Sequence, residues 1–142
     1  MLWVLGYAAK AQEVRWDTCK FMTYNVLNFD NTGNDKEQYL FEVVDSMHPD
    51  ILIVQELIEL SGAIRFFDSV VYKVDTNYAM GTFINSFDTD NGIYYRKDKF
   101  AFITNTPITT ELRDINEFQL KHIASGEEIY FYSLHLKASS GG

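Results

Sequence analysis

The chain contains a single cysteine, Cys19, and only three histidines among its 142 residues. One cysteine cannot form an intramolecular disulfide, and the scattered histidines lack the close ligand spacing of a zinc site. Basic residues are also scarce, with 12 Lys and Arg against 20 Asp and Glu and a formal net charge of −8. Because binding to phosphate backbones by charge alone needs a basic surface, the acidic balance argues against that class of nucleic-acid binder. It does not exclude a nuclease in which a divalent cation supplies the positive charge.

Residues 1–11 have the features of the end of a secretory signal. A short apolar stretch is followed by Ala9-Lys10-Ala11, which fits an A-x-A cleavage signature, although a positively charged opening region is missing. The stretch is too short to span a bilayer, and we expect no transmembrane segment. We therefore predict a secreted or periplasmic protein in which residues 1–11 are a signal-peptide remnant and residues 12–142 form part of one domain, whose C-terminal half is missing. An N-terminal strand or helix without a targeting role is the alternative.

The first half of the domain alternates between strand and helix patterns. Residues 20–28 form an apolar run typical of a buried strand, and residues 36–47 place apolar side chains on one helical stripe. A second apolar strand occupies residues 51–56, and a second helix is predicted from about residue 61 to 72, with Ser61 as its N-cap. A strand–helix–strand order predicts parallel neighbouring strands joined by a crossover helix.

From residue 92 onward the pattern is that of strands alone, after a possible short strand at 82–84. We predict strands at 92–96, 100–104, 108–112, 116–123 and 129–136. The intervening Lys97-Asp98, Asn105-Thr106-Pro107 and Ser125-Gly126-Glu127-Glu128 are short turns, which predict antiparallel hairpins. The whole pattern predicts an α/β (α+β) fold in which a mixed sheet carries two helices on one side.

Three apolar stretches each deliver one polar, chemically capable side chain. The stretch DILIVQE runs four aliphatic residues into Glu56, TYNVLNF is interrupted by Asn25, and YSLHLKA carries His135 near its end. An ionised carboxylate at the end of a buried strand is costly unless a cation or several hydrogen-bond donors meet it. Each residue also has a plain structural explanation: a solvated strand-end Glu, a hydrogen-bonding Asn and a satisfied strand His.

These motifs, in this order, resemble the endonuclease/exonuclease/phosphatase superfamily, which includes DNase I-like nucleases, AP endonucleases, sphingomyelinases and inositol phosphatases. The likeness covers residues 21–138, includes a middle strand pair around residues 92–100, and is closest to secreted bacterial members. It implies a four-layer α/β sandwich of the DNase I-like kind. It also implies hydrolysis of phosphodiester or phosphomonoester bonds with Mg²⁺, or with Mn²⁺ or Ca²⁺ in its place.

The resemblance also implies roles for individual residues. Glu56 matches the metal-binding Glu, Asn25 the active-site Asn that reaches metal or phosphate, and His135 the catalytic His of the DNase I-like and sphingomyelinase-like branches. Arg113 lies 22 residues before His135, where DNase-like members carry a phosphate-contacting Arg; an exposed loop Arg is the alternative. The residue types suit this chemistry, because Mg²⁺ takes one or two carboxylates and keeps several waters. Histidine can bind or protonate a phosphate oxygen.

Two later motifs of the superfamily, Gly-Asp-x-Asn and the Ser-Asp-His that supplies the general base, do not occur in this sequence. We therefore expect the chain to be the N-terminal portion of a longer phosphoesterase and to be nearly inactive alone, because an incomplete catalytic constellation loses most of its rate. The substrate stays open between nucleic acid, a phospholipid head group and a sugar phosphate, and no stable protein partner is predicted. A non-catalytic secreted α/β binding module or remnant is the alternative.

Overall fold

The computed structural model describes residues 17–33, 35–86, 88–111 and 113–136. The predicted signal-peptide remnant at residues 1–11 lies outside them. Along the chain the elements are β1 (Phe21–Phe29), α1 (Lys36–Met47), β2 (Ile51–Leu57), α2 (Glu59–Phe66), the π-helical segment η1 (Phe67–Val71), α3 (Tyr72–Val74), β3 (Tyr78–Met80), β4 (Asp90–Arg96), β5 (Phe100–Ile108), β6 (Ile115–His122) and β7 (Glu128–Ser133).

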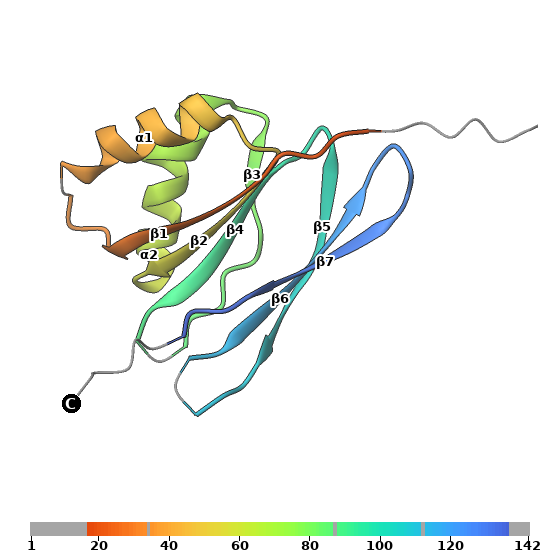
Figure 1. The fold of residues 1–142 in the computed structure, drawn as a ribbon. Helices are drawn as coiled ribbons and strands as arrows, with labels where there is room; N and C mark the ends of the chain where they lie inside the picture. Colours follow the sequence, from red (N-terminus) through yellow and green to blue (C-terminus); the bar gives the residue numbers. More distant parts are fainter. Residues whose placement is uncertain (1–16, 34, 87, 112, 137–142) are drawn as a thin grey trace, which may run out of the picture.

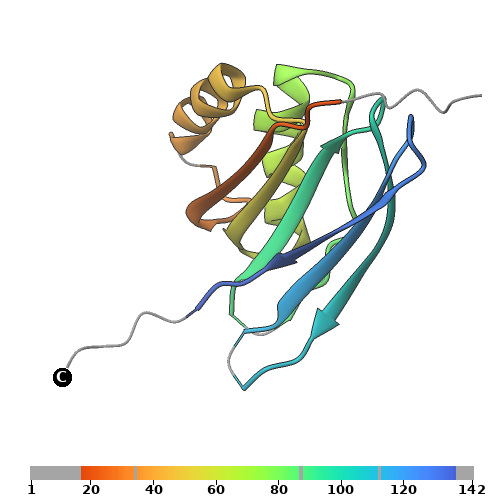
Figure 2. The ribbon, with the colours of Figure 1, turned by 45° about the vertical axis from the view of Figure 1, so that its right-hand side comes forward.

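The strands form two sheets that pack face to face. The first sheet has the order β1-β2-β4-β3 and the second the order β5-β6-β7. The helices cover one face of the first sheet, and the second sheet lies on its other face (Figures 1 and 2). The predicted α/β (α+β) fold, with a mixed sheet and helices on one side, is confirmed.

Strand β2 lies at the centre of the first sheet. It pairs with β1 in parallel and with β4 antiparallel, so α1 is the predicted crossover helix. Its residues Ile51, Leu52, Ile53 and Val54 are each at most 3% exposed. Leu52 and Val54 pack towards the helices, whereas Ile51 and Ile53 pack towards the second sheet. An uninterrupted apolar run is what a strand covered on both faces requires.

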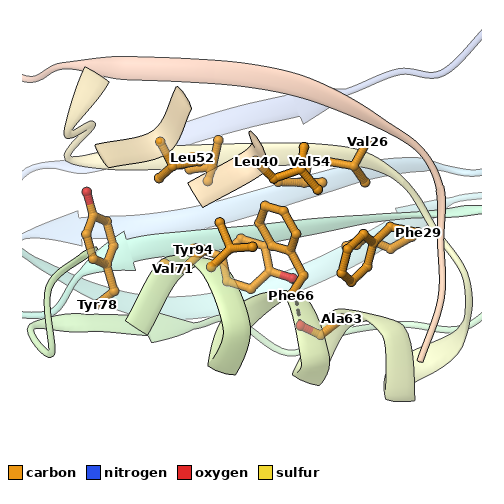
Figure 3. Close-up of a cluster of buried hydrophobic side chains, with 13 residues drawn as sticks. Val26, Phe29, Leu40, Leu52, Val54, Ala63, Phe66, Val71, Tyr78 and Tyr94 are labelled. Carbon is orange, nitrogen blue, oxygen red and sulfur yellow. Dashed lines mark hydrogen bonds between the residues drawn. The ribbon is translucent and has the colours of Figure 1, made fainter. Parts of the chain in front are cut away.

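The core under the helices is centred on Phe66 of α2. Its ring lies edge-on to Phe29 with centroids 5.5 Å apart, and against Tyr94 at 5.3 Å (Figure 3). The buried Tyr94 hydroxyl donates a hydrogen bond of 2.9 Å to the Ala63 carbonyl, so burial leaves this polar group satisfied. Burying each such side chain contributes roughly 1.5–3 kcal/mol. This core fixes the ends of β1 and β2, where the site is built.

The second helix differs from its prediction. It begins at Glu59 rather than 61, its N-cap is Ile58, and Ser61 lies inside the helix without capping it. The reason is packing, because Gly62, Ala63 and Phe66 form the buried face of this helix.

No helix among the described residues is both long and apolar enough to cross a bilayer.

Four predictions about strands and turns are also wrong. Lys97-Asp98 does not close a hairpin, because β4 and β5 belong to different sheets. Residues 105–107 lie inside β5, which tolerates Pro107 because it is an edge strand, and residues 109–111 belong to no strand. The short strand falls at Tyr78–Met80 instead of 82–84. The hairpin between β6 and β7 is confirmed, with Gly126 at a φ of +76° in its turn.

Candidate active site

The side chains between the two sheets change from apolar to polar towards one end of the sandwich. Successive residues in a strand face opposite sides, so each strand contributes an inward-facing row. These rows run Ile51, Ile53, Gln55 in β2; Tyr95, Ile93, Asn91 in β4; Leu120, Phe118, Asn116 in β6; and Ile129, Phe131, Ser133 in β7. The ends of β1, β2 and β7 and the starts of β4 and β6 meet there (Figure 2).

Glu56 is turned towards this end by an irregularity shared by β1 and β2. The pairing register shifts between Asn25 and Phe29, and Glu56 itself has a φ of +63°. Such irregularities re-aim a side chain that strict alternation would send to the opposite face. Glu56 Oε1 accepts a 2.9 Å hydrogen bond from Asn25 Nδ2, and Oε2 accepts one of 3.0 Å from the Asn28 N–H. The first sheet therefore presents a carboxylate held by two donors.

The second sheet contributes His135 and Arg113 to the same place. His135 Nε2 lies 3.1 Å from Glu56 Oε1, and Arg113 Nη1 lies 3.0 Å from the His135 ring nitrogens. An imidazole that donates from Nε2 to Glu56 and accepts at Nδ1 from Arg113 satisfies both contacts. Asp88 Oδ2 in turn accepts from Arg113 Nε at 3.0 Å and Nη2 at 2.7 Å. We call Asn25, Glu56, Asp88, Arg113 and His135 the polar end.

Backbone strain gathers at the polar end. Of the six non-glycine residues with positive φ in the described part of the chain, Leu27, Asn28, Glu56 and Asp88 lie here, at +53°, +50°, +63° and +82°. Each such residue costs on the order of 1 kcal/mol or more, and such residues cluster at functional sites. This backbone evidence is independent of the side chains that first suggested the site.

The residues present fit a magnesium ion held largely by water. Within the described residues, no group of three or more His, Cys, Asp or Glu is arranged to hold a metal. Glu56 Oε1 accepts from both Asn25 and His135, whereas among the described residues Oε2 accepts only from the Asn28 N–H, which leaves it a lone pair for a metal ion. Magnesium needs only one or two carboxylates, with waters and substrate oxygens completing its shell, so Glu56 would hold it. A calcium cage of six to eight protein oxygens does not fit.

The structure thus brings together all four residues singled out in the sequence, Asn25, Glu56, Arg113 and His135. Asp88 was missed, because it lies in a sequence typical of a turn and its role depends on Arg113, which is 25 residues away. No local pattern links the two. The buried amides Asn91 and Asn116 were missed as well, although each stands where an inward-facing apolar row would otherwise continue.

A separate groove lies on the helical layer between α1 and α2. It is lined in part by Asn31, Glu37, Arg65 and Lys73. Arg65 already pairs with Glu37 and donates a 2.6 Å hydrogen bond from Nη1 to the Asn31 carbonyl. None of the residues of the polar end lines this groove, so it is not the candidate active site.

Comparison with protein-family models and with curated proteins found no match. Among solved structures, D. rerio TDP2 complexed with single strand DNA product has a TM-score of 0.65 and 22% identity over 86% of this chain and 47% of that chain. ANGEL2, a 2′,3′-cyclic phosphatase in complex with adenosine-2′,3′-vanadate, has a TM-score of 0.61 and 14% identity over 85% of this chain and 42% of that chain. The human Nocturnin catalytic domain with bound sulfate has a TM-score of 0.56 and 18% identity over 80% and 48%.

All three belong to the endonuclease/exonuclease/phosphatase superfamily. This chain has the DNase I-like fold. It spans about half the length of these solved structures. The DNase I-like fold inferred from the motifs is therefore confirmed, whereas the closer likeness to secreted bacterial members finds no support among them.

Proposed function

We propose that this chain supplies the metal-binding and phosphate-contacting part of a hydrolytic phosphoesterase. The observation that carries the proposal is the convergence of Glu56 from the first sheet with His135 and Arg113 from the second. A carboxylate that contacts an imidazole, which in turn contacts a guanidinium, matches the needs of phosphoester hydrolysis: a cation site, a proton donor and an anion partner. The DNase I-like fold supports the same reading as an analogy.

Each residue has a distinct task in this proposal. Glu56 would hold Mg²⁺, and Asn25 orients the carboxylate by donating to Oε1. Arg113, aligned by Asp88, contacts the phosphate together with His135, whose Nε2–H can donate to a phosphate oxygen once it leaves Glu56. When bound, the magnesium ion would polarise the phosphoryl group and offset its developing negative charge. Mn²⁺ and Ca²⁺ are the other candidate ions, and the sparse protein ligation favours Mg²⁺ over Ca²⁺.

The proposal includes the expectation that the 142-residue chain hydrolyses phosphoesters slowly or not at all. The sequence carries neither the Gly-Asp-x-Asn motif nor the Ser-Asp-His motif, and the latter supplies the general base in the superfamily that this chain resembles. We propose that a longer protein supplies this base and that residues 1–11 direct secretion or export to the periplasm. The substrate remains open between nucleic acid, a phospholipid head group and a sugar phosphate.

One observation favours the alternative of a non-catalytic binding module. The Glu56 carboxylate is already met by three donors, from Asn25, Asn28 and His135, and so needs no cation to be stable. A self-sufficient carboxylate of this kind would be enough for a purely structural site. The two readings differ in whether the polar end takes up Mg²⁺ and then phosphate.

The test is an NMR titration of the 142-residue chain with MgCl₂ and then with inorganic phosphate. We expect Mg²⁺ to shift the Asn28 amide signal, because that N–H donates to Glu56 Oε2. Phosphate should then shift the His135 and Arg113 side-chain signals. The variant Arg113→Gln should weaken phosphate binding by about tenfold, since a charge-assisted contact is worth about 1.4 kcal/mol or more.

Arg96→Gln is the matched control for this experiment. Arg96 lies at the other end of β4, where it pairs with Asp75 and Asp98, and its replacement changes net charge equally. Phosphate binding that is equally weak in both variants would mean non-specific electrostatics. Absence of any Mg²⁺-dependent shift at Asn28 would favour the binding module. In parallel, hydrolysis of bis-p-nitrophenyl phosphate by the 142-residue chain is expected to be near the uncatalysed rate.

A further inference from the structure

The polar end is divided between two sheets that share no backbone hydrogen-bond ladder. Asn25 and Glu56 belong to β1 and β2, whereas Arg113 precedes β6 and His135 follows β7. The 3.1 Å contact between His135 Nε2 and Glu56 Oε1 therefore depends on how the sheets are placed relative to each other. The apolar residues between the sheets hold them together, but apolar packing is non-directional and does not by itself set this placement.

Directional contacts between the sheets occur directly below the polar end. Asn91 of β4 donates from Nδ2 to Asn116 Oδ1 of β6 at 2.9 Å, and more weakly to the Ser133 carbonyl of β7 at 3.4 Å. Asn116 then donates to Asn105 Oδ1 at 3.1 Å, and Asn105 to the Thr82 carbonyl at 3.0 Å. The four side chains of Asn91, Asn105, Asn116 and Ser133 are 3–7% exposed. The side chains of Asn91, Asn116 and Asn105 form a buried chain of hydrogen-bonded amides that we call the amide chain.

We propose that Asn91 is a positioning residue that holds His135 and Arg113 of the second sheet against Glu56 of the first. Its two acceptors, the Ser133 carbonyl and the Asn116 side chain, lie two residues before His135 and three residues after Arg113, so one side chain contacts the segments that lead to both. Gln55, the neighbour of Glu56, adds a longer contact of 3.4 Å to Ser133 Oγ. What the polar end binds rests on the proposed function, whereas the placement of His135 does not.

The energetics of the amide chain indicate positioning rather than stability. Asn91 Oδ1 is buried and has no hydrogen-bond partner among the described residues, and the same holds for Thr89 Oγ1 and Asp90 Oδ2. An unsatisfied buried polar group lowers stability, and an apolar side chain of similar size would avoid that cost. The inward-facing row of β4, with Ile93 and Tyr95, is apolar up to this point. The amide of Asn91 therefore serves to orient the two sheets relative to each other rather than to stabilise the fold.

The test compares Asn91→Leu with Asn105→Leu. Both replacements remove a buried amide of the same chain and substitute a side chain of similar size, but Asn105 bonds to the Thr82 carbonyl and not to β7. The first readout is the set of ¹H–¹⁵N signals of the His135 ring, which report its contacts without any ligand. The second is the affinity for inorganic phosphate in the presence of Mg²⁺. Urea unfolding of both variants measures their loss of unfolding free energy, so that their effects are compared at a known loss of stability.

We expect Asn91→Leu to move the His135 ring signals and to weaken phosphate binding by about tenfold, because misplacement on the order of 1 Å strongly weakens oriented contacts. Asn105→Leu should leave the ring signals in place and change the phosphate affinity by less than about twofold, because Asn91 keeps both of its acceptors in that variant. Equal effects of the two variants at equal loss of stability would overturn the proposal.

Two further arms keep the outcomes distinct. If Asn91→Leu does not fold, Asn91→Ser and Asn105→Ser make the same comparison with smaller side chains that can still form hydrogen bonds. If the wild-type chain binds no phosphate, the proposed function fails, but the His135 ring signals still decide whether Asn91 positions the ring.

Discussion

The positive φ of Glu56 predicts that replacement by glycine is less destabilising there than replacement by alanine, the reverse of the usual order in a strand. A left-handed conformation costs an alanine about 1–2 kcal/mol, a cost that glycine does not bear. In an ordinary strand glycine is instead less stable than alanine by roughly 0.5–1 kcal/mol, because it loses more conformational freedom on folding. At Glu56, with a φ of +63°, we expect Glu56→Gly to be more stable than Glu56→Ala by about 0.5–1 kcal/mol.

Both variants remove the same carboxylate and leave the same donors of Asn25, Asn28 and His135 without it, so their difference isolates the backbone. Urea unfolding measures this difference as a midpoint shift of roughly 0.5 M, given m-values of about 1–3 kcal/mol/M. Lys121 on the exposed face of β6 supplies the control pair, in which Lys121→Ala should be the more stable member. Finding the same order at both positions would refute the argument from strain.

Three further outcomes follow from burial and charge. Phe66→Ala should lower the free energy of unfolding by about 3–5 kcal/mol, measured by urea unfolding, because it empties the centre of the helix-side core; a loss below about 1 kcal/mol would contradict this packing. Burial favours a higher pKa for Asp50, but hydrogen bonds from the Lys20 N–H and the Lys99 ammonium outweigh it and hold the pKa below its usual 3.8. The ionised Asp50 therefore stabilises the fold above pH 3.8, and this stabilisation is lost as pH falls through the folded-state pKa. Asp50→Asn should lower the free energy of unfolding at neutral pH by about 2 kcal/mol, and should make that free energy fall less steeply at acid pH. Burial raises the pKa of Asp90, so the protonated side chain stabilises the fold fully below pH 3.8, and this stabilisation declines as pH rises through the folded-state pKa. Asp90→Asn should remove this decline in the free energy of unfolding. Stability-versus-pH curves of these two variants that run parallel to the wild-type curve would contradict both assignments.

The fold could be predicted largely because its signals are local. A few consecutive residues are enough to predict the buried strand from Ile51 to Val54 and the apolar stripe of α1. Both β2 and α1 lie where the sequence predicts them. Errors arose where tertiary context decides. The residues Lys97-Asp98 are typical of a turn, but the neighbouring sequence does not indicate that the chain passes here from one sheet to the other. Pro107 predicts a turn, but the structure accommodates it in an edge strand.

The candidate site divides in the same way. Glu56, Asn25 and His135 could be found because each is a polar residue in an apolar run, and the order of the runs matches a known superfamily. The left-handed backbone of Glu56 and the contact between Arg113 and Asp88 could not be found, since they depend on register shifts and on loops that meet only in the folded chain. The amide chain is the intermediate case, because the change from apolar to polar is visible in each strand but its pairing is not.

Direct measurement of Mg²⁺ binding by isothermal titration calorimetry tests the central claim, that Glu56 is the metal ligand of a phosphoesterase site. We predict that the wild-type chain binds Mg²⁺ and that Glu56→Gln weakens binding by about tenfold or more. Glu59→Gln, an equal change of charge at an exposed residue three positions along the chain, should alter it by less than about twofold. No binding by the wild-type chain, or equal binding by wild type and Glu56→Gln, would contradict the account.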